Sequence, residues 1–167
     1  MVTAVDSAKY YVLQVITGCE LDVAKELNRR GVSAIIPLEN RAIRTKGKWT
    51  TKPYVIFPGY VFINIKYSWS QYYIMSGIKG VVRLLGGGHS PEPLSKQETD
   101  LLIRQADMFR EPSTVSLFDG GYKIVSGVLL MLKDNIKKID RHAHRAIIEM
   151  SIAGKKTEFR LSFMTAE

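Results

Sequence analysis

The apolar positions of residues 1–110 alternate between strand-like and helix-like spacing. A run of β-branched and aromatic residues at 10–16 predicts a largely buried strand. Residues 19–30 then place Leu21, Ala24 and Leu27 three positions apart, which is the periodicity of a helix, and Gly31 follows as its expected C-terminal cap. Similar signals predict further strands at 32–37, 55–57, 60–65 and 80–85, a short helix at 69–75, and a longer helix at 96–110.

Two local polar signals mark the ends of elements in the same region. Ser95 and Glu98 have the spacing of a capping box at the start of the predicted helix 96–110. Residues 41–52 are polar and basic, and Lys46-Gly47-Lys48 at their centre predicts the tip of a hairpin.

The pattern changes character after residue 110. Residues 111–119 are rich in Pro, Ser, Thr, Asp and Gly, which predicts a connector. Only short strand-like segments follow, at 122–125, 128–132, 135–140, 146–152 and 157–163. We therefore expect an α+β protein, with an α/β domain at 1–107, a linker at 108–119 and a small β-barrel module at 120–167.

Composition limits the class of protein. The 167 residues include 46% apolar side chains, which is typical of a globular protein and excludes a disordered chain or a simple coiled coil. Lys and Arg number 24 against 16 Asp and Glu, so the net charge of +8 favours a polyanionic partner. A single cysteine excludes an intrachain disulfide and fits a reducing compartment. Because we find neither a signal peptide nor a membrane-length apolar run, we expect a cytoplasmic protein without membrane contact.

Catalytic chemistry is not indicated. Cys19 lies where a helix start could stabilise a thiolate, but a residue packed against the sheet is the simpler interpretation. His142 and His144 with Asp140 lack a further spaced pair of metal ligands. The glycines at 86–88 are not followed by the Gly-Lys-Ser/Thr of a phosphate-binding loop. The sequence therefore predicts a protein that is not an enzyme and needs no cofactor or metal.

Binding chemistry is visible in the C-terminal module. Residues 123–160 hold nine basic and four acidic side chains, and two adjacent segments of a small barrel can converge on one face. Phosphate binding requires such a cluster, because each neutralised phosphate releases counterions. The alternative is a solvated β-turn surface. The candidate RNA-binding residues are Lys133, Lys137, Lys138, Arg141, His142, His144, Arg145, Lys155, Lys156 and Arg160.

Several blocks give the chain a resemblance to the NusG family of bacterial transcription elongation factors, with a KOW module at the C-terminus. The N-terminal blocks are Tyr10-Tyr11-Val12-Leu13-Gln14, Thr17-Gly18-Cys19-Glu20, Ile36-Pro37 and Phe57-Pro58-Gly59-Tyr60-Val61-Phe62. Those in the tail are Gly127, Ile139-Asp140, Arg145, Ile152, Gly154, Leu161 and Phe163. The resemblance implies an antiparallel sheet flanked by helices, followed by an SH3-like barrel.

The resemblance also implies a mechanism. The N-terminal domain would bind the clamp helices of the RNA polymerase β′ subunit and bridge the cleft towards β, which suppresses pausing. The contact residues implied are Tyr10, Tyr54, Phe57, Pro58 and Tyr60, although Phe57 and Tyr60 also fit core positions. The residues implied to lie near upstream DNA are Arg29, Arg30, Lys79 and Arg83.

Departures from the family pattern point to a specialised member. Tyr10 stands where general members carry Trp, Asp134 replaces the second KOW glycine, and Ala153 replaces an exposed Phe that docks a ribosomal protein or the Rho terminator. The pattern most resembles the LoaP group of antiterminators. We therefore expect a monomeric, processive antitermination factor that reads a nascent RNA hairpin through its basic module.

Three alternatives remain open. A general elongation factor of the same family would use its barrel to bind ribosomal protein or Rho. An RNA-processing enzyme or nuclease could be built on a basic barrel, although the sequence offers no paired carboxylates. A ribosome-associated KOW protein would leave the Phe57-Pro58-Gly59-Tyr60 region unexplained.

Overall fold

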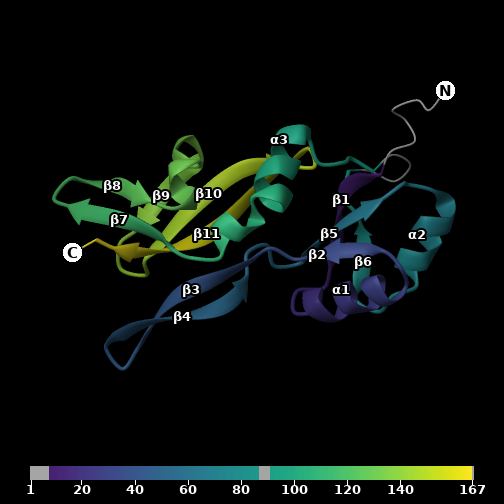
Figure 1. Cartoon of the computed structure of the whole chain (residues 1–167), viewed down its shortest axis with the longest axis horizontal. Helices are drawn as coiled ribbons and strands as arrows, with labels where there is room; N and C mark the ends of the chain where they lie inside the picture. Colours follow the sequence, from purple (N-terminus) through teal and green to yellow (C-terminus); the bar gives the residue numbers. More distant parts are fainter. Residues whose placement is uncertain (1–7, 87–90, 167) are drawn as a thin grey trace. The chain divides into compact units, whose positions relative to one another are not determined.

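The computed structural model describes residues 8–86 and 91–166, which form two compact units. The first unit comprises the chain up to Ile36 together with Phe57–Ile103 and Ile152–Lys155. The second unit comprises Pro37–Ile56, Arg104–Ser151 and the chain from Lys156 onwards. The architecture is mixed α+β, with helices in the first unit and a curled antiparallel and parallel sheet in the second (Figure 1).

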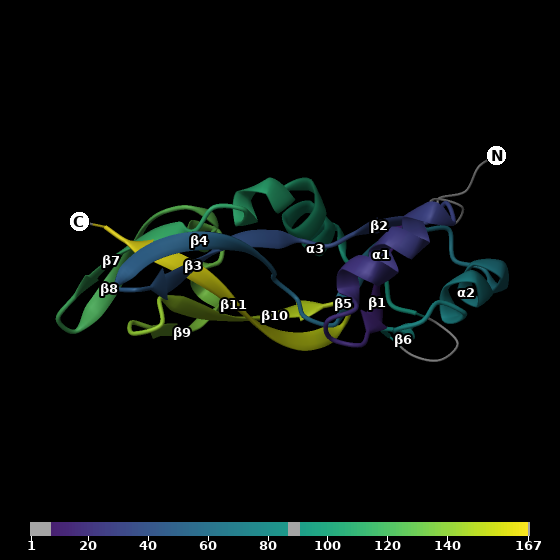
Figure 2. The same cartoon turned by 90° about the horizontal axis from the view of Figure 1, so that it is seen from below.

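The first unit is built on a four-stranded antiparallel sheet. Its strands are β1 (Lys9–Val15), β2 (Ser33–Ile35), β5 (Tyr60–Ile65) and β6 (Val81–Leu84), in the order β2-β5-β1-β6. Helix α1 (Glu20–Arg29) covers one face of this sheet (Figure 2). Its residues Val23, Ala24 and Leu27 pack into the core with apolar side chains from β1 and β5. Helix α2 (Trp69–Ser76) follows β5.

The strands and helices predicted for 10–30 are confirmed. β1 and α1 occupy these positions, and Gly31 adopts φ of +84°, which glycine accommodates without strain. The predicted helix 96–110 is only partly correct. The capping box of Ser95 and Glu98 is present, but α3 (Lys96–Thr99) gives way to a π turn at Asp100–Arg104 and a 3-10 turn at Ala106–Phe109. The Thr99 hydroxyl donates to the Ser95 carbonyl over 2.8 Å, a side-chain bond that typically bends helices.

A long hairpin follows the first helix in sequence but belongs to the second unit. Strands β3 (Leu38–Thr45) and β4 (Lys48–Val55) pair along their whole length, and the predicted tip at Lys46 and Gly47 is confirmed. Both tip residues have positive φ, as the favoured two-residue hairpin turns require. We call residues 38–55 the basic hairpin.

The second unit contains a five-stranded sheet in the order β8-β7-β11-β10-β9. The strands are β7 (Ser113–Phe118), β8 (Gly121–Ser126), β9 (Ile136–Asp140), β10 (Arg145–Ile152) and β11 (Lys155–Thr165). β11 pairs with β7 in parallel, whereas β7 with β8 and β10 with β9 pair in antiparallel orientation. The curled sheet agrees with the predicted SH3-like module.

Two predictions about this region were wrong. The expected connector over 111–119 contains strand β7, whose Val115 is fully buried. Pro112 and Asp119-Gly120, which suggested a linker, instead lie at either side of a strand. The expected strand at 128–132 is a 3-10 turn at Val128–Leu130. Within 128–132, Val128, Leu129 and Leu132 are buried while the two residues between them are exposed, a pattern that suits a helical turn rather than alternation.

Among the described residues, no helix is both long enough and apolar enough to cross a membrane.

Candidate functional site

The Pro58-Gly59 turn is held by a buried glutamate. Glu20, at the start of α1, accepts hydrogen bonds from the backbone N–H of Gly59 over 3.0 Å and of Gly18 over 2.9 Å. Burial alone raises the pKa of the Glu20 carboxyl, but the N–H groups of Gly18, Gly59 and Glu20 itself reverse that effect and hold the pKa below its ordinary value. The carboxylate therefore fixes the turn between β4 and β5 to the turn between β1 and α1. In the sequence, Glu20 is visible only as part of the Thr17-Gly18-Cys19-Glu20 block, which does not reveal this role.

The aromatic residues beside this turn differ in exposure. Phe57 is 2% exposed and packs edge-to-face against Phe62, with ring centroids 5.6 Å apart, so its ring supports the turn from the core. Pro58 is exposed, whereas Tyr10 on β1 and Tyr60 on β5 are half-buried. Of the four candidate polymerase-binding residues in the first unit, Pro58, Tyr10 and Tyr60 have accessible atoms, and Phe57 has almost none.

Tyr54, the fifth candidate, lies on β4 in the second unit. Tyr54 is 40% exposed, and the Arg41 guanidinium lies 5.0 Å from the centroid of its ring. This cation–π contact joins β3 to β4 within the basic hairpin.

The predicted RNA-binding cluster is partly neutralised by acids of the same sheet. Lys137 on β9 forms salt bridges with Glu158 over 3.1 Å and with Glu149 over 3.6 Å. Lys156 on β11 forms one with Glu149 over 3.2 Å. The hydrogen bond to Glu158 and the charges of Glu158 and Glu149 raise the pKa of Lys137. The hydrogen bond from Lys156, together with the charges of Lys156 and Lys137, lowers the pKa of Glu149. These two lysines therefore present less free positive charge than the sequence suggested.

Three more members of the cluster make structural contacts. Arg141 donates to the carbonyl oxygens of Phe118, over 2.8 Å, and Gly121, at the turn between β7 and β8. Arg145 is half-buried and donates to the carbonyl of Ala143 over 3.0 Å. His144 is stacked between two rings, with Trp49 at 3.9 Å and 5° on one side and Phe163 at 5.2 Å on the other.

The remaining predicted RNA-binding residues of the second unit are exposed. Lys133 lies in a short 3-10 turn before β9, Lys138 on β9, His142 in the turn after it and Arg160 on β11. The turn of residues 141–144, which we call the His142 turn, brings His142 close to the His144 imidazole and Arg145. Among the predicted cations of the second unit, Lys137 and Lys156 are thus ion-paired with acids of the sheet, whereas Lys133, Lys138, His142 and Arg160 are exposed.

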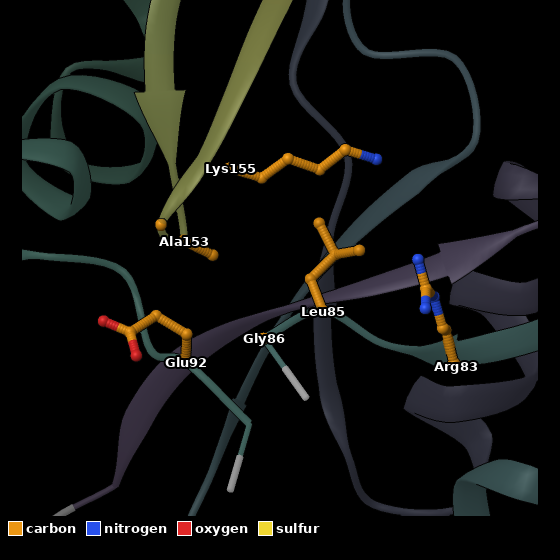
Figure 3. A pocket seen from close by; sticks show the side chains of 7 residues that line it. Arg83, Leu85, Gly86, Glu92, Ala153 and Lys155 are labelled. Atoms are coloured by element: carbon orange, nitrogen blue, oxygen red, sulfur yellow. The ribbon is translucent and has the colours of Figure 1, made fainter. Parts of the chain in front are cut away.

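A cavity of about 340 Å³ in the first unit contains two predicted site residues. Figure 3 shows Arg83, Leu85 and Glu92 lining it, with Ala153 and Lys155 from the turn between β10 and β11. Ala153 is 2% exposed and its N–H donates to a Glu98 carboxylate oxygen over 3.1 Å. The family's exposed aromatic position is therefore a packed turn residue here, with φ of +50°.

The residues expected near upstream DNA are only partly brought together. Arg30 and Lys79 line one cavity of about 640 Å³ beside Cys19 and the end of α2. Arg29 and Arg30 both bind Glu26, and their hydrogen bonds lower the pKa of that carboxyl to about 2. Arg83 instead donates to Gln14 over 3.0 Å.

The basic hairpin contributes residues that the sequence analysis did not assign to a site. Glu39 is 2% exposed and accepts from the Ser162 N–H over 3.1 Å and from Arg41 over 2.8 Å. Trp49 supplies the stack on His144. The basic composition of 41–52 was visible in the sequence, but its attachment to the C-terminal sheet depends on these long-range contacts.

Among the described residues, no three His, Cys, Asp or Glu side chains lie together in a group that could hold a metal ion. His89, in the Gly-rich loop, lies outside the described residues.

Comparisons with known proteins agree with this arrangement. Residues 8–103 match the family described as transcription termination factor NusG. The chain is 24% identical to the transcription termination/antitermination protein NusG of Buchnera aphidicola, over 95% of each chain. It is 23% identical to the protein of the same name from Bacillus subtilis, covering 92% of this chain and 94% of that protein.

A solved structure described as domain interaction in Thermotoga maritima NusG aligns with a TM-score of 0.57 and 22% identity, over 95% of this chain and 96% of that one, and supports the fold. The chain combines a helix-covered sheet with a curled sheet consistent with a KOW module, which is the two-part arrangement of a NusG-type transcription factor. It belongs to the NusG family of transcription termination/antitermination factors.

Proposed function

We propose that this protein is a processive antitermination factor that binds RNA polymerase through its N-terminal domain and a nascent RNA hairpin through its basic KOW module. Family membership supports the transcriptional role. The observation that carries the polymerase contact is the Pro58-Gly59 turn, which the buried Glu20 carboxylate holds in place with Pro58 exposed. A rigid apolar projection loses little conformational entropy when it docks against a partner helix.

The polymerase surface is centred on Pro58 in this proposal, with Tyr10 and Tyr60 at its margin. Phe57 acts by supporting the turn. The expected partner is the clamp-helix tip of the β′ subunit, and the first unit reaches towards β from there. Arg30 and Lys79, which share a cavity, are proposed to face upstream DNA.

The polymerase contact is tested with a charged substitution at an exposed apolar position. Pro58→Lys places an ammonium group in the proposed interface without adding an acid beside Glu20. We expect it to weaken binding of the full chain to bacterial core RNA polymerase at least tenfold, because a buried unpaired charge is costly. Leu21→Lys is the matched control, because Leu21 is 62% exposed in the same unit. Equal binding by both variants would contradict the proposed surface.

The RNA contact is proposed on the second unit. Lys138, His142, Lys133 and Arg160 are exposed there and provide phosphate-binding charge. A factor recruited by an RNA hairpin would increase read-through of a terminator only on templates that encode that hairpin.

A specialised role in the manner of the LoaP group fits the buried Ala153. The position lacks the exposed aromatic side chain expected of a general factor that docks ribosomal protein or Rho. We therefore propose a monomeric cytoplasmic factor that acts at selected operons. Tight binding of the isolated protein to ribosomal protein or Rho would instead favour the general elongation factor.

A further inference from the structure

The basic hairpin carries a concentration of positive charge that its own strands do not neutralise. Its five cations are Arg41, Arg44, Lys46, Lys48 and Lys52, against the single acid Glu39. From residue 40 to residue 91 the chain contains no Asp or Glu at all. Among the described residues, Arg41 is the one cation of these five with a salt bridge, and its partner is the buried Glu39.

The strand register places like charges opposite each other. Arg41 pairs with Lys52 across the ribbon, and like charges in directly opposed positions destabilise a β ribbon. Lys46 and Lys48 flank Gly47 at the tip and are both exposed. An anion bound against the hairpin would relieve the repulsion between these charges.

Specific contacts attach this hairpin to the C-terminal sheet within the second unit. Glu39 accepts from the Ser162 N–H on β11, and the Asn40 N–H donates to the Arg110 carbonyl over 2.6 Å. Nearer the tip, Trp49 stacks on His144, which in turn stacks on Phe163 of β11. Contacts thus occur both at the base of the ribbon and near its tip.

The stack brings cations of the hairpin towards those of the His142 turn. Burial lowers the pKa of His144, and the charges of Arg145, Arg44 and His142 lower it further. Burial also lowers the pKa of Arg145, and Arg41 contributes in the same direction. Arg41 and Arg44 come from β3, whereas His142 and Arg145 come from the end of β9 and the start of β10, so both segments contribute to one positive region.

We propose that the basic hairpin and the His142 turn form one composite RNA-binding surface, in which the hairpin lysines and Arg44 bind phosphates. This inference rests on the proposed RNA binding. It adds a second segment, not contiguous in the sequence, to the RNA-binding surface. The excess of five cations over one buried acid favours a polyanion over a protein partner, because the core of a protein interface is depleted of lysine. Trp49 is half-buried and stacks on His144. Because this stack attaches the hairpin to the sheet, the phosphate-binding side chains of the hairpin belong to a fixed surface.

The test compares charge removal at the hairpin tip with the same change elsewhere. The full chain is titrated with a fluorescently labelled RNA stem-loop at several salt concentrations, and with duplex DNA of the stem sequence. Lys46→Gln/Lys48→Gln should weaken RNA binding about tenfold or more near 0.1 M salt and should reduce the salt slope by about 1.4–1.8. Lys25→Gln/Lys96→Gln, at two exposed lysines of the first unit, is the matched control and should remain within about twofold of the unmodified chain.

The outcomes separate this inference from the proposed function. If the unmodified chain binds RNA and Lys138→Gln/His142→Gln weakens it, while the hairpin variant behaves like the control, the hairpin is not part of the site and the RNA-reading function stands. If the unmodified chain binds no RNA, both proposals fail. If the unmodified chain binds duplex DNA as tightly as the RNA stem-loop, and the hairpin variant loses both affinities to the same extent, the ligand is a polyanion in general rather than RNA.

Discussion

The two basic ribbons of the second unit use their acids differently. On β9–β11, the half-buried Glu149 and the exposed Glu158 bind Lys137 and Lys156 and cancel charge at the surface. On the basic hairpin, the one acid is buried, binds the Ser162 backbone and leaves the lysines of the tip without an acidic partner among the described residues. Charge counted along a sequence therefore does not give the charge of a surface, because cross-strand neighbours decide which cations remain free.

The largest expected effect comes from breaking the hairpin's attachment at its buried acid. Glu39→Ala leaves the Ser162 N–H and the Arg41 guanidinium without their partner, and should lower the free energy of unfolding by about 3 kcal/mol. Hydrogen exchange of residues 38–55 should accelerate as well. The matched change Glu158→Ala, at an exposed acid of the other ribbon, should leave the denaturation midpoint unchanged. Similar losses in both variants would remove the distinction between a structural and a neutralising acid.

A smaller effect is expected from pH, through the stack that joins the two ribbons. The pKa of His144 in the folded chain is lower than its ordinary value near 6.5, first because of burial and then because of Arg145, Arg44 and His142. The neutral imidazole therefore contributes stability that is complete above pH 6.5 and is lost as the pH falls through the folded pKa. Unfolding measured at a series of pH values from about 7.5 to well below about 6.5 should show a fall in stability as the pH decreases.

The same pH series identifies the group responsible. His144→Asn, which tolerates the positive φ of this position, should flatten the pH dependence, and His142→Asn should keep it. An unchanged slope in His144→Asn would assign the effect to other groups.

The smallest effect is expected at the ion-paired lysine of β9. Lys137→Gln removes a charge that Glu158 and Glu149 already balance, so the salt slope of RNA binding should stay constant. Lys48→Gln, at the hairpin tip, should reduce that slope by about 0.7–0.9. Equal changes in the two single variants would indicate that ion pairing on the sheet does not limit phosphate binding.

Local signals in the sequence predicted much of the first unit correctly. The strand at 10–16, the helix at 19–30 and the Ser95–Glu98 capping box depend on residues within one or two turns of each other, so short-range patterns suffice. The predicted polymerase-binding block is found at an exposed turn, yet Phe57 within it is a core residue. Exposure of a single aromatic depends on distant side chains, here on Phe62 of β5.

The second unit shows where short-range patterns fail. The residues 113–118 look like a linker in composition, and they become β7 because they pair with β8 and, in parallel, with β11. Residues 128–132 are uniformly apolar, so their sequence does not distinguish a strand from a helical turn. The pairing of β7 with β11 joins residues far apart in the chain, and the turn at 128–130 is fixed to β7 by the Leu129 N–H, which donates to the Ser113 hydroxyl over 3.0 Å.

The sequence by itself determined the family, the α+β class, the excess of positive charge and the position of the hairpin tip, because each of these is written in composition, order or short-range spacing. Only the tertiary structure decided that the hairpin belongs with the C-terminal sheet, that Glu20 and Glu39 are structural carboxylates, and which lysines are free. These properties depend on contacts between residues up to 123 positions apart, as between Glu39 and Ser162. Folding brings such residues together when long-range pairing and burial outweigh the local preferences of each segment.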